Sequence, residues 1–422
     1  MAILRIENLS TRIRVYLFGK RIFSFHKKDP YSQIQSNYAA KLEELKSVFG
    51  TRKIRVGFLV CEPAKWQYQS VYEALEADPN FEPVVLVTKM TEDLDHYKTL
   101  EDCLTFFQDT LGLRTEPAYD DKHGWLPPRN FGIDILFYQQ PWFLNDIQSP
   151  VPVSDYALTC YAPYAFQVAN EKSQYMKGFH RYLWRFFLQD EAILLDIKKL
   201  AGDASHNCSV AGYPKLDNYI GQQHCADLPS VGTRKVIIYA PHHSFEKDSL
   251  NFATFQRNGK AILDMAYRYR NDVYWIFKPH PRFKYAVIAN GIMSQKEIED
   301  YYTAWKELGQ IYDYGDYFPL FRRSDALITD CGSFLGEYVP TGHPLFHLWS
   351  DSAPYNDSLR RLSASFYRIH SFDQLEQEVR CVILEGDDYK KAERESAGLK
   401  LFNPQKSSAS QIIRLIEAAL DK

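Results

Sequence analysis

The chain has 422 residues, of which 45% are hydrophobic, 24% charged and 15% aromatic. This length is too great for one ordinary hydrophobic core, and the composition is not that of a disordered chain, so we expect two globular domains. A formal net charge of -3 excludes a chain-wide surface for nucleic acid, so any recognition of phosphate must be local.

The first 30 residues are basic and amphipathic. Lysine and arginine occur seven times there and acidic residues twice, which leaves a net charge of +5, and apolar residues are interleaved with them. This pattern is typical of a segment that lies on an anionic membrane surface. The alternative is a basic helix packed against the protein's own body. We expect residues 1–50 to form this amphipathic segment and residues 1–28 to contain the membrane contact.

The seven cysteines are scattered through the chain without a CxxC pair, which argues against a disulfide framework or a structural zinc site. The sequence has no run of 18 or more apolar residues and no apolar secretory signal at its start. It therefore predicts a cytoplasmic protein with reduced thiols, whose membrane contact is peripheral and at the inner face of the cell membrane.

Residues 51–211 alternate between apolar, β-branched segments and amphipathic ones. Strands are expected at 54–60, 81–87 and 133–138, and helices at 65–77 and 91–111. Such alternation implies a parallel sheet with crossover helices. We therefore predict an N-terminal Rossmann-like domain.

A second alternation follows an interdomain connection at 212–230 that contains several glycines and prolines. Its strands are expected at 235–241, 273–279, 311–314 and 326–330, and its helices at 259–269 and 294–308. We predict a C-terminal Rossmann-like domain over 231–400 and a closing helix over 401–422, where serines that can cap a helix precede an apolar stripe. The predicted fold class is α/β, with two Rossmann-like domains that face a cleft.

Two histidine-bearing loops follow strands of the second alternation. Ligands of open α/β sheets bind beyond the carboxyl ends of the strands, and there YAPHHS brings His242 and His243, while KPHPR brings His280 between two prolines. An imidazole can donate to a phosphoryl oxygen or accept a proton, and Lys278 and Arg282 add positive charge. The alternatives are a loop whose histidines only form structural hydrogen bonds and a structural Pro-His turn.

A third loop follows the last of these strands, where Asp330 precedes a turn of small residues and a predicted helix. Gly332 and Ser333 would offer backbone amides and a hydroxyl group to an anion. Asp330 could brace the loop, and Glu337 could accept a hydrogen bond from a ribose hydroxyl. The alternative is an ordinary capped helix after a core strand.

Five segments, taken in order, resemble the CDP-glycerol glycerophosphotransferase family of teichoic-acid and capsule polymerases. They are GYPKLD, a tight turn at the domain junction, then YAPHHS, KPHPR, SDALITDCGSFLGEY and LFNPQKSSASQIIRLI. The resemblance implies the GT-B fold, with a cytidine nucleotide donor held mainly by the C-terminal domain and the acceptor by the N-terminal domain. It implies an enzyme that transfers glycerol phosphate, or a related polyol phosphate, from a CDP-activated donor to a polysaccharide or lipid-linked acceptor such as capsule or teichoic acid, and releases CMP.

The resemblance also implies roles for individual residues. His280 falls on a histidine that is important for the transfer, His242 on the strand-end contact to the nucleotide donor, and Lys215 on an arginine that contacts it. The sequence departs from the family at residues 331–332, where Tyr-Ser is usual, and at the His242-His243 pair, where threonine is usual at the first position. These departures bear on which group the nucleotide donor carries.

The predicted site has a nucleotide-donor side and an acceptor side. His280 and His242 are the predicted catalytic residues. The predicted contacts to the nucleotide donor are Gly212, Tyr213, Lys215, Pro241, His243, Lys278, Arg282, Asp330, Gly332, Ser333 and Glu337. On the acceptor side the family's TWHGTP-type histidine is missing, so we expect Tyr161 in its place, or an acidic group such as Glu62 or Asp155. No carboxylate cluster has the spacing of metal ligands, so no metal or other cofactor is predicted to be obligatory.

Two other functions remain open on the sequence. Sialyl- and Kdo-transferases of similar architecture also hold a cytidine nucleotide with an HP loop and a serine-containing turn, so a CMP-sugar glycosyltransferase is the nearest alternative. A non-catalytic subunit of polysaccharide assembly is the second, because the missing histidine is compatible with a loss of the chemistry.

Overall fold

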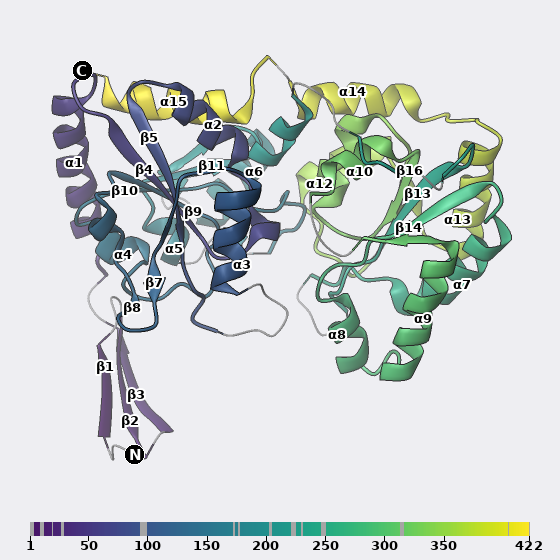
Figure 1. Cartoon of the computed structure of the whole chain (residues 1–422), viewed down its shortest axis with the longest axis horizontal. Helices are drawn as coiled ribbons and strands as arrows, with labels where there is room; N and C mark the ends of the chain where they lie inside the picture. The colour runs from purple at the N-terminus through teal and green to yellow at the C-terminus, as the bar shows by residue number, and fades with distance from the viewer. Residues whose placement is uncertain are drawn as a thin grey trace. The chain divides into compact units, whose positions relative to one another are not determined.

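The computed structural model describes residues 4–8, 12–18, 20–26, 29–92, 99–171, 174–175, 178–201, 205–220, 225–228, 231–245, 250–312, 316–403 and 405–421. The chain divides into two compact units (Figure 1). Unit 1 comprises Met1–Tyr164, Ser173–Pro214 and Ser408–Lys422, and unit 2 comprises Ala165–Lys172 and Lys215–Ser407.

Unit 1 is built on a seven-stranded parallel sheet in the order β12-β11-β10-β9-β4-β5-β6. Its strands are β4 (Ile54–Val60), β5 (Phe81–Val87), β6 (Thr115–Pro117), β9 (Ile135–Tyr138), β10 (Leu158–Tyr161), β11 (Arg185–Leu188) and β12 (Cys208–Val210), and a separate hairpin pairs β7 (Tyr119–Asp120) with β8 (Gly124–Trp125). The strands predicted at 54–60 and 81–87 are confirmed. Central strands of a parallel sheet are covered on both faces, so they are nearly continuous apolar runs in the sequence.

Helices pack against this sheet and complete the core of unit 1. They are α1 (Tyr31–Val48), α2 (Gln69–Ala77), α3 (Leu100–Thr105), α4 (Pro150–Val153), α5 (Gly178–Arg181), α6 (Glu191–Ala201) and α15 (Ser408–Leu420). The predicted apolar stripe of α15 packs against α1 and α2 (Figure 1). Ile412 and Ile416 are buried there in one cluster with Leu75. The helix predicted at 91–111 is shorter, because α3 begins at Leu100; residues 93–98 lie outside the described part of the chain.

The N-terminal segment forms a small antiparallel sheet. β1 (Leu4–Asn8) pairs with β2 (Arg12–Leu17), and β2 pairs with β3 (Lys20–His26). This finding corrects the alternative of a basic helix, because apolar and polar side chains that alternate along β2 follow the two-residue period of a strand. Within the described residues, no helix combines the length and the apolar character needed to cross a bilayer.

Unit 2 is built on a six-stranded parallel sheet in the order β15-β14-β13-β16-β17-β18. Its strands are β13 (Lys235–Ala240), β14 (Val273–Phe277), β15 (Gly309–Ile311), β16 (Ala326–Thr329), β17 (Leu345–Leu348) and β18 (Tyr367–Ile369). Its helices are α7 (Phe255–Arg268), α8 (Phe283–Ala289), α9 (Gln295–Leu308), α10 (Phe318–Arg323), α11 (Phe334–Glu337), α12 (Asp357–Leu362), α13 (Phe372–Val379) and α14 (Lys391–Leu401).

The core of unit 2 is dominated by aromatic side chains. Trp275 from β14 and Trp305 from α9 are fully buried in one apolar cluster, and the ring of Phe277 stacks on Trp305 at 5.1 Å between centroids. The strand predicted at 311–314 is β15, which ends at Ile311; residues 313–315 lie outside the described part of the chain. Both units are parallel α/β sheets of the Rossmann-like type, as predicted.

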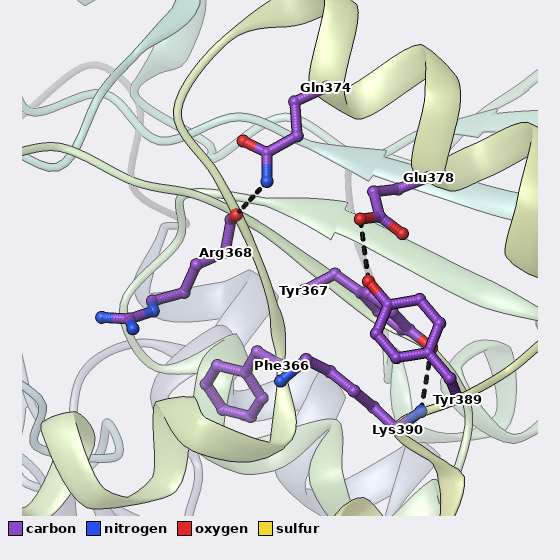
Figure 2. A pocket seen from close by; sticks show the side chains of 7 residues that line it. All are labelled: Phe366, Tyr367, Arg368, Gln374, Glu378, Tyr389 and Lys390. Carbon is purple, nitrogen blue, oxygen red and sulfur yellow. Dashed lines mark hydrogen bonds between the residues drawn. The ribbon is translucent and has the colours of Figure 1, made fainter.

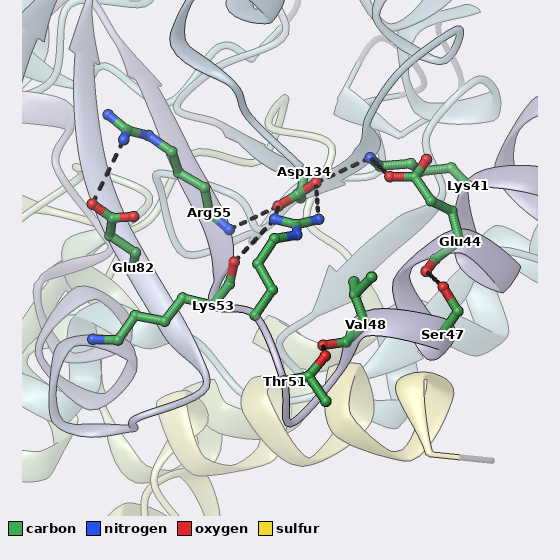
Figure 3. A network of polar contacts seen from close by, with 10 residues as sticks. Lys41, Glu44, Ser47, Val48, Thr51, Lys53, Arg55, Glu82 and Asp134 are labelled. Atoms are coloured by element: carbon green, nitrogen blue, oxygen red, sulfur yellow. Dashed lines mark hydrogen bonds and ion pairs between the residues drawn. The ribbon is translucent and has the colours of Figure 1, made fainter.

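A buried carboxylate ties α1 to the sheet of unit 1 (Figure 3). Asp134 accepts hydrogen bonds from the Nζ of Lys41 at 3.0 Å, from the guanidinium of Arg52 at 2.6 and 3.1 Å, and from the backbone N–H of Arg55 at 3.0 Å. Burial alone would raise the pKa of Asp134, but these donors together hold it below its ordinary value. The ionised carboxylate therefore stabilises the junction of α1, β4 and β9.

We expect Asp134→Asn to destabilise unit 1 by about 1–2 kcal/mol at pH 7, because the ion pairs are lost but Arg52 is half exposed and can turn to water. A carboxyl group whose pKa is lowered by folding stabilises the fold above its unfolded pKa, and this contribution is lost as the pH falls through the folded value. The difference from wild type in free energy of unfolding should therefore shrink below about pH 4. Urea unfolding at pH 7 and pH 3.5 measures it, and a difference that grows with acid would contradict this account.

Candidate functional site

Two Pro-His dipeptides lie side by side at the carboxyl ends of β13 and β14. The strands pair in register, with Tyr239 opposite Phe277, so the two dipeptides that follow continue the same alignment. The backbone N–H of His280 donates to the carbonyl of Pro241 at 3.1 Å and extends the ladder past the strands. The ring centroids of His242 and His280 are 5.1 Å apart.

A third imidazole completes this cluster. His243 stacks on His280 with 4.0 Å between ring centroids and lies 4.4 Å from the ring of His242. His242 is buried, whereas His243 and His280 are partly exposed. Burial, followed by the repulsion of neighbouring imidazoles, holds the pKa of both His242 and His280 well below the ordinary value. These two rings are therefore neutral at neutral pH.

Asp330 fastens the histidine loop from the neighbouring strand end. It follows β16, is fully buried, and accepts hydrogen bonds from the backbone N–H of His242 at 2.6 Å and from the N–H and hydroxyl of Thr254 at 2.6 and 2.8 Å. Burial raises the pKa of Asp330 to about 6. The carboxylate thus braces the loop, in the role that the sequence suggested, and joins it to the start of α7.

The small-residue turn after Asp330 is closely packed. A Cβ atom on Gly332 would lie 2.7 Å from Phe252 and 2.8 Å from Val168, so glycine is required unless these side chains move. The helix predicted after the turn is a single turn, α11, so its dipole contributes little, and the role of Gly332 and Ser333 toward an anion stays a prediction.

Two lysines gather around the phenol of Tyr317. The Nζ of Lys215 lies 3.4 Å from the hydroxyl of Tyr317, and the Nζ of Lys278 lies 5.0 Å from the centre of its ring. The same hydroxyl donates to a carboxylate oxygen of Glu337 at 2.7 Å. Both lysines are largely buried, and Glu337 is fully buried. This second cluster therefore combines two cations with one carboxylate, and Tyr317, which the sequence did not point to, joins them.

Gly212, Tyr213 and Arg282 are the remaining predicted contacts to the nucleotide donor. Gly212 has φ +89° and packs against Ser408, and the hydroxyl of Tyr213 donates to the carbonyl of Tyr164 at 3.0 Å; both belong to unit 1. Arg282 is exposed and directly precedes α8. Their contacts to a nucleotide donor stay predictions.

The two predicted acceptor-side residues lie at strand ends of unit 1. Tyr161 is a core residue that stacks on Phe186 at 5.6 Å, and burial raises its pKa well above the ordinary value. It is therefore poorly suited to act as a base. Glu62 follows β4, is largely buried, and its carboxylate accepts from the backbone N–H of Ala64 at 3.3 Å.

The three imidazoles are also the one candidate metal cluster in the described part of the chain. One ligand atom from each of His242, His243 and His280 lies within 4.8 Å of the others. However, backbone N–H groups donate to the Nδ1 of His242 and of His280 at 3.1 Å. A neutral ring that accepts at Nδ1 carries its proton on Nε2, so Nε2 has no lone pair for a cation. The observed hydrogen bonds therefore do not fit a metal on these two rings.

A hollow of about 170 Å³ lies beside the edge strand β18 (Figure 2). It is lined by Phe366, Tyr367, Arg368, Gln374, Glu378, Tyr389 and Lys390. Polar groups of the lining form hydrogen bonds with one another; for example, the hydroxyl of Tyr389 donates to the carboxylate of Glu378 at 2.8 Å. None of the predicted site residues lines it, so we do not assign a function to it.

A known protein family matches the part of the sequence that contains the imidazole cluster and the lysine cluster around Tyr317. The CDP-glycerol:poly(glycerophosphate) glycerophosphotransferase family matches residues 194–399, which include every predicted contact to the nucleotide donor. No protein of curated function matches the chain significantly.

Solved structures match over most of the chain. A UDP-N-acetylglucosamine 2-epimerase is 13% identical, with a TM-score of 0.58 over 88% of this chain and 96% of its own. The UDP-GlcNAc 2-epimerase of Neisseria meningitidis, bound to UDP-GlcNAc, is 12% identical, with a TM-score of 0.56 over 87% of this chain and 99% of its own. The wall teichoic acid polymerase TagF is 13% identical, with a TM-score of 0.53 over 93% of this chain and 98% of its own.

At these identities the structural matches establish the fold, which is GT-B-like, as predicted. Residues 194–399 match the CDP-glycerol:poly(glycerophosphate) glycerophosphotransferase family, as the resemblance predicted, and the match indicates a transferase.

Proposed function

We propose that the chain transfers glycerol phosphate, or a related polyol phosphate, from a CDP-activated donor to a surface polymer of the teichoic-acid type and releases CMP. One observation carries the proposal. Within the residues that match the family, His242, His280 and Lys278 gather at the carboxyl ends of adjacent parallel strands, where such sheets bind nucleotides.

The chemistry requires stabilisation of negative charge on a diphosphate. An acceptor hydroxyl forms a new bond to the β-phosphorus as the bond from that phosphorus to the bridging oxygen breaks. CMP leaves with the electron pair, and the hydroxyl proton passes to a base. Most of the catalysis of phosphoryl transfer lies in positioning and charge stabilisation. Lys215, Lys278 and the imidazoles of His242 and His280 supply the positive groups and hydrogen-bond donors for this purpose.

The acceptor side rests on fewer observations. We propose a polysaccharide or lipid-linked acceptor, because the matched family acts on poly(glycerophosphate) and the structural matches include a wall teichoic acid polymerase; a capsule polymer is the related alternative. Glu62 lies at the carboxyl end of β4 in unit 1, and we propose it as the acid-base group of the acceptor side.

A panel of nucleotide donors tests the proposed function. Purified full-length protein is incubated with CDP-glycerol, CDP-ribitol, CMP-sialic acid or CMP-Kdo, together with a glycerol phosphate polymer as acceptor, and released CMP is measured by chromatography. We expect acceptor-dependent release from a CDP-polyol. Release from a CMP-sugar alone would refute the proposal and favour a glycosyltransferase.

We further propose that the N-terminal sheet binds the inner face of an anionic membrane, as the basic sequence of residues 1–28 suggests. Large apolar side chains are exposed in the β2-β3 turn and in β3, where Phe18 and Phe23 are 71% and 58% exposed. Lys20 and Arg21 are exposed between them. Apolar side chains flanked by basic ones suit a surface of anionic lipid. Residues 1–3, 9–11, 19 and 27–28 lie outside the described part of the chain.

The double variant Phe18→Ser, Phe23→Ser should bind vesicles with anionic lipid at least about 100-fold more weakly than wild type, because each aromatic side chain contributes about 1.5–3 kcal/mol when it leaves water. Vesicle flotation across a range of lipid concentrations measures the affinity. Tyr285→Ser removes an aromatic side chain of similar exposure, 65%, from α8 in unit 2 and is the matched control. Equal flotation of the double variant and this control would rule out the N-terminal sheet as the membrane contact.

A further inference from the structure

The two Pro-His loops hold their imidazoles in the same way. In each loop the backbone N–H two residues after the histidine donates to its Nδ1: Ser244 to His242, and Arg282 to His280, both at 3.1 Å. His242 has a second contact at this atom, because the hydroxyl oxygen of Ser244 lies 2.7 Å from its Nδ1.

These contacts decide which ring nitrogen carries the proton. A backbone N–H can only donate, so the Nδ1 that faces it must present a lone pair. Because the Nδ1 of His242 presents a lone pair to the backbone N–H of Ser244, the Ser244 hydroxyl beside it can only donate to that nitrogen, and its oxygen accepts from the backbone N–H of Phe252 at 3.1 Å. A proton on either Nδ1 would oppose an N–H across 3.1 Å. The neutral ring therefore has its proton on Nε2.

From this geometry we infer that His242 and His280 act as neutral Nε2–H hydrogen-bond donors to phosphoryl oxygens, with Ser244 as the positioning residue that fixes the tautomer of His242. The identity of the bound oxygens rests on the proposed function, whereas the tautomer does not. Neither ring can then take the proton of the acceptor hydroxyl, because Nε2 is already protonated and Nδ1 is occupied. The base must come from outside this pair.

The surroundings favour neutral rings. His242 faces His243, His280 and the nearby charge of Arg282, and His280 faces both other imidazoles together with Lys278 and Arg282. The carboxylate of Asp330 accepts from the backbone N–H of His242 and from the N–H and hydroxyl of Thr254. Burial and these neighbours make a positive charge on either ring costly. The lysines thus supply the charge, and the imidazoles supply directed neutral donors.

The tautomer can be measured without substrate. Full-length protein labelled with ¹⁵N-histidine is examined by long-range ¹H-¹⁵N correlation at pH 7.5, and His242→Gln and His280→Gln assign the two rings. We expect both rings to show protonated Nε2 and unprotonated Nδ1. Protonated Nδ1, or two protonated nitrogens on either ring, would overturn the inference even if the enzyme transfers glycerol phosphate as proposed.

A glutamine substitution also distinguishes a hydrogen-bond donor from a base during turnover. Its amide N–H₂ can replace an Nε2–H donor but cannot act as a base. We expect His280→Gln to retain CMP release within about tenfold of wild type, whereas loss of a donor altogether costs about 10²-fold or more. If glutamine is as inactive as alanine at this position in a protein that still binds CDP, His280 is a base and the inference is wrong.

Ser244 is tested with a conservative pair of variants. Ser244→Ala removes the hydroxyl from Nδ1 of His242, so we expect that ¹⁵N resonance to move while the one of His280 does not, and kcat to fall about tenfold, the usual effect of one lost hydrogen bond, with KM nearly unchanged. Ser244→Thr keeps the hydroxyl and should restore both readouts. An unmoved His242 resonance in Ser244→Ala would remove Ser244 from this role.

Discussion

His280→Ala should lower kcat for CMP release by about 10²–10³-fold, the effect expected when one prepositioned donor to developing negative charge is removed. His280 lies at the end of β14 beside His242, and its backbone N–H anchors it to Pro241. Because the side chain is partly exposed and adds little to the core, the protein should keep its melting temperature.

A histidine elsewhere in unit 2 provides the control for this variant. His370 is exposed after β18, and His370→Ala should leave both kcat and stability unchanged. Initial rates of CMP release across a range of CDP-glycerol concentrations separate kcat from KM. A His280→Ala enzyme with wild-type kcat would show that the Pro-His loops do not take part in the transfer.

Asp330→Ala should be the most destabilising single change at the site, by about 3 kcal/mol, and should abolish CMP release. The carboxylate is fully buried and accepts from His242 and from both donors of Thr254. Its removal leaves buried backbone N–H groups without an acceptor, at about 1–3 kcal/mol each. It also releases the loop that carries His242. Chemical unfolding and melting temperature measure the loss of stability.

The control for Asp330 is Asp264→Ala on α7, because Asp264 is exposed and such substitutions change stability by about 0.5 kcal/mol or less. Asp330→Asn keeps one acceptor oxygen and should be intermediate in stability. Wild-type stability in Asp330→Ala would mean that the hydrogen bonds to this carboxylate contribute nothing net to unit 2.

The sequence was informative for strands in the middle of each sheet. β4, β5 and β13 are six or seven residues long and apolar at all but one or two positions, and their length and β-branched side chains separate them from helices. β10, β11, β17 and β18 are three or four residues long, too short to show a period, and they were not predicted. The alternating residues of β2 predict an amphipathic segment, but a strand of six residues is too short to be distinguished from a basic helix in the sequence.

The candidate site was predictable where it depends on strand ends. The Pro-His dipeptides follow paired strands, so the sequence alone placed His242 and His280 at the same edge. Tyr317 and Thr254 could not be found in this way. Each lies outside the motifs and directly precedes a helix, Thr254 before α7 and Tyr317 before α10, and their hydroxyl groups meet the site only through the packing of unit 2.

A crystal structure with CDP-glycerol bound tests the central claim most directly. The claim is that the strand ends of β13, β14 and β16 hold the nucleotide donor. We expect the diphosphate within hydrogen-bonding distance of Nε2 of His242 and His280, with the ammonium group of Lys278 nearby. A diphosphate bound elsewhere, with both imidazoles beyond the reach of its oxygens, would contradict the account.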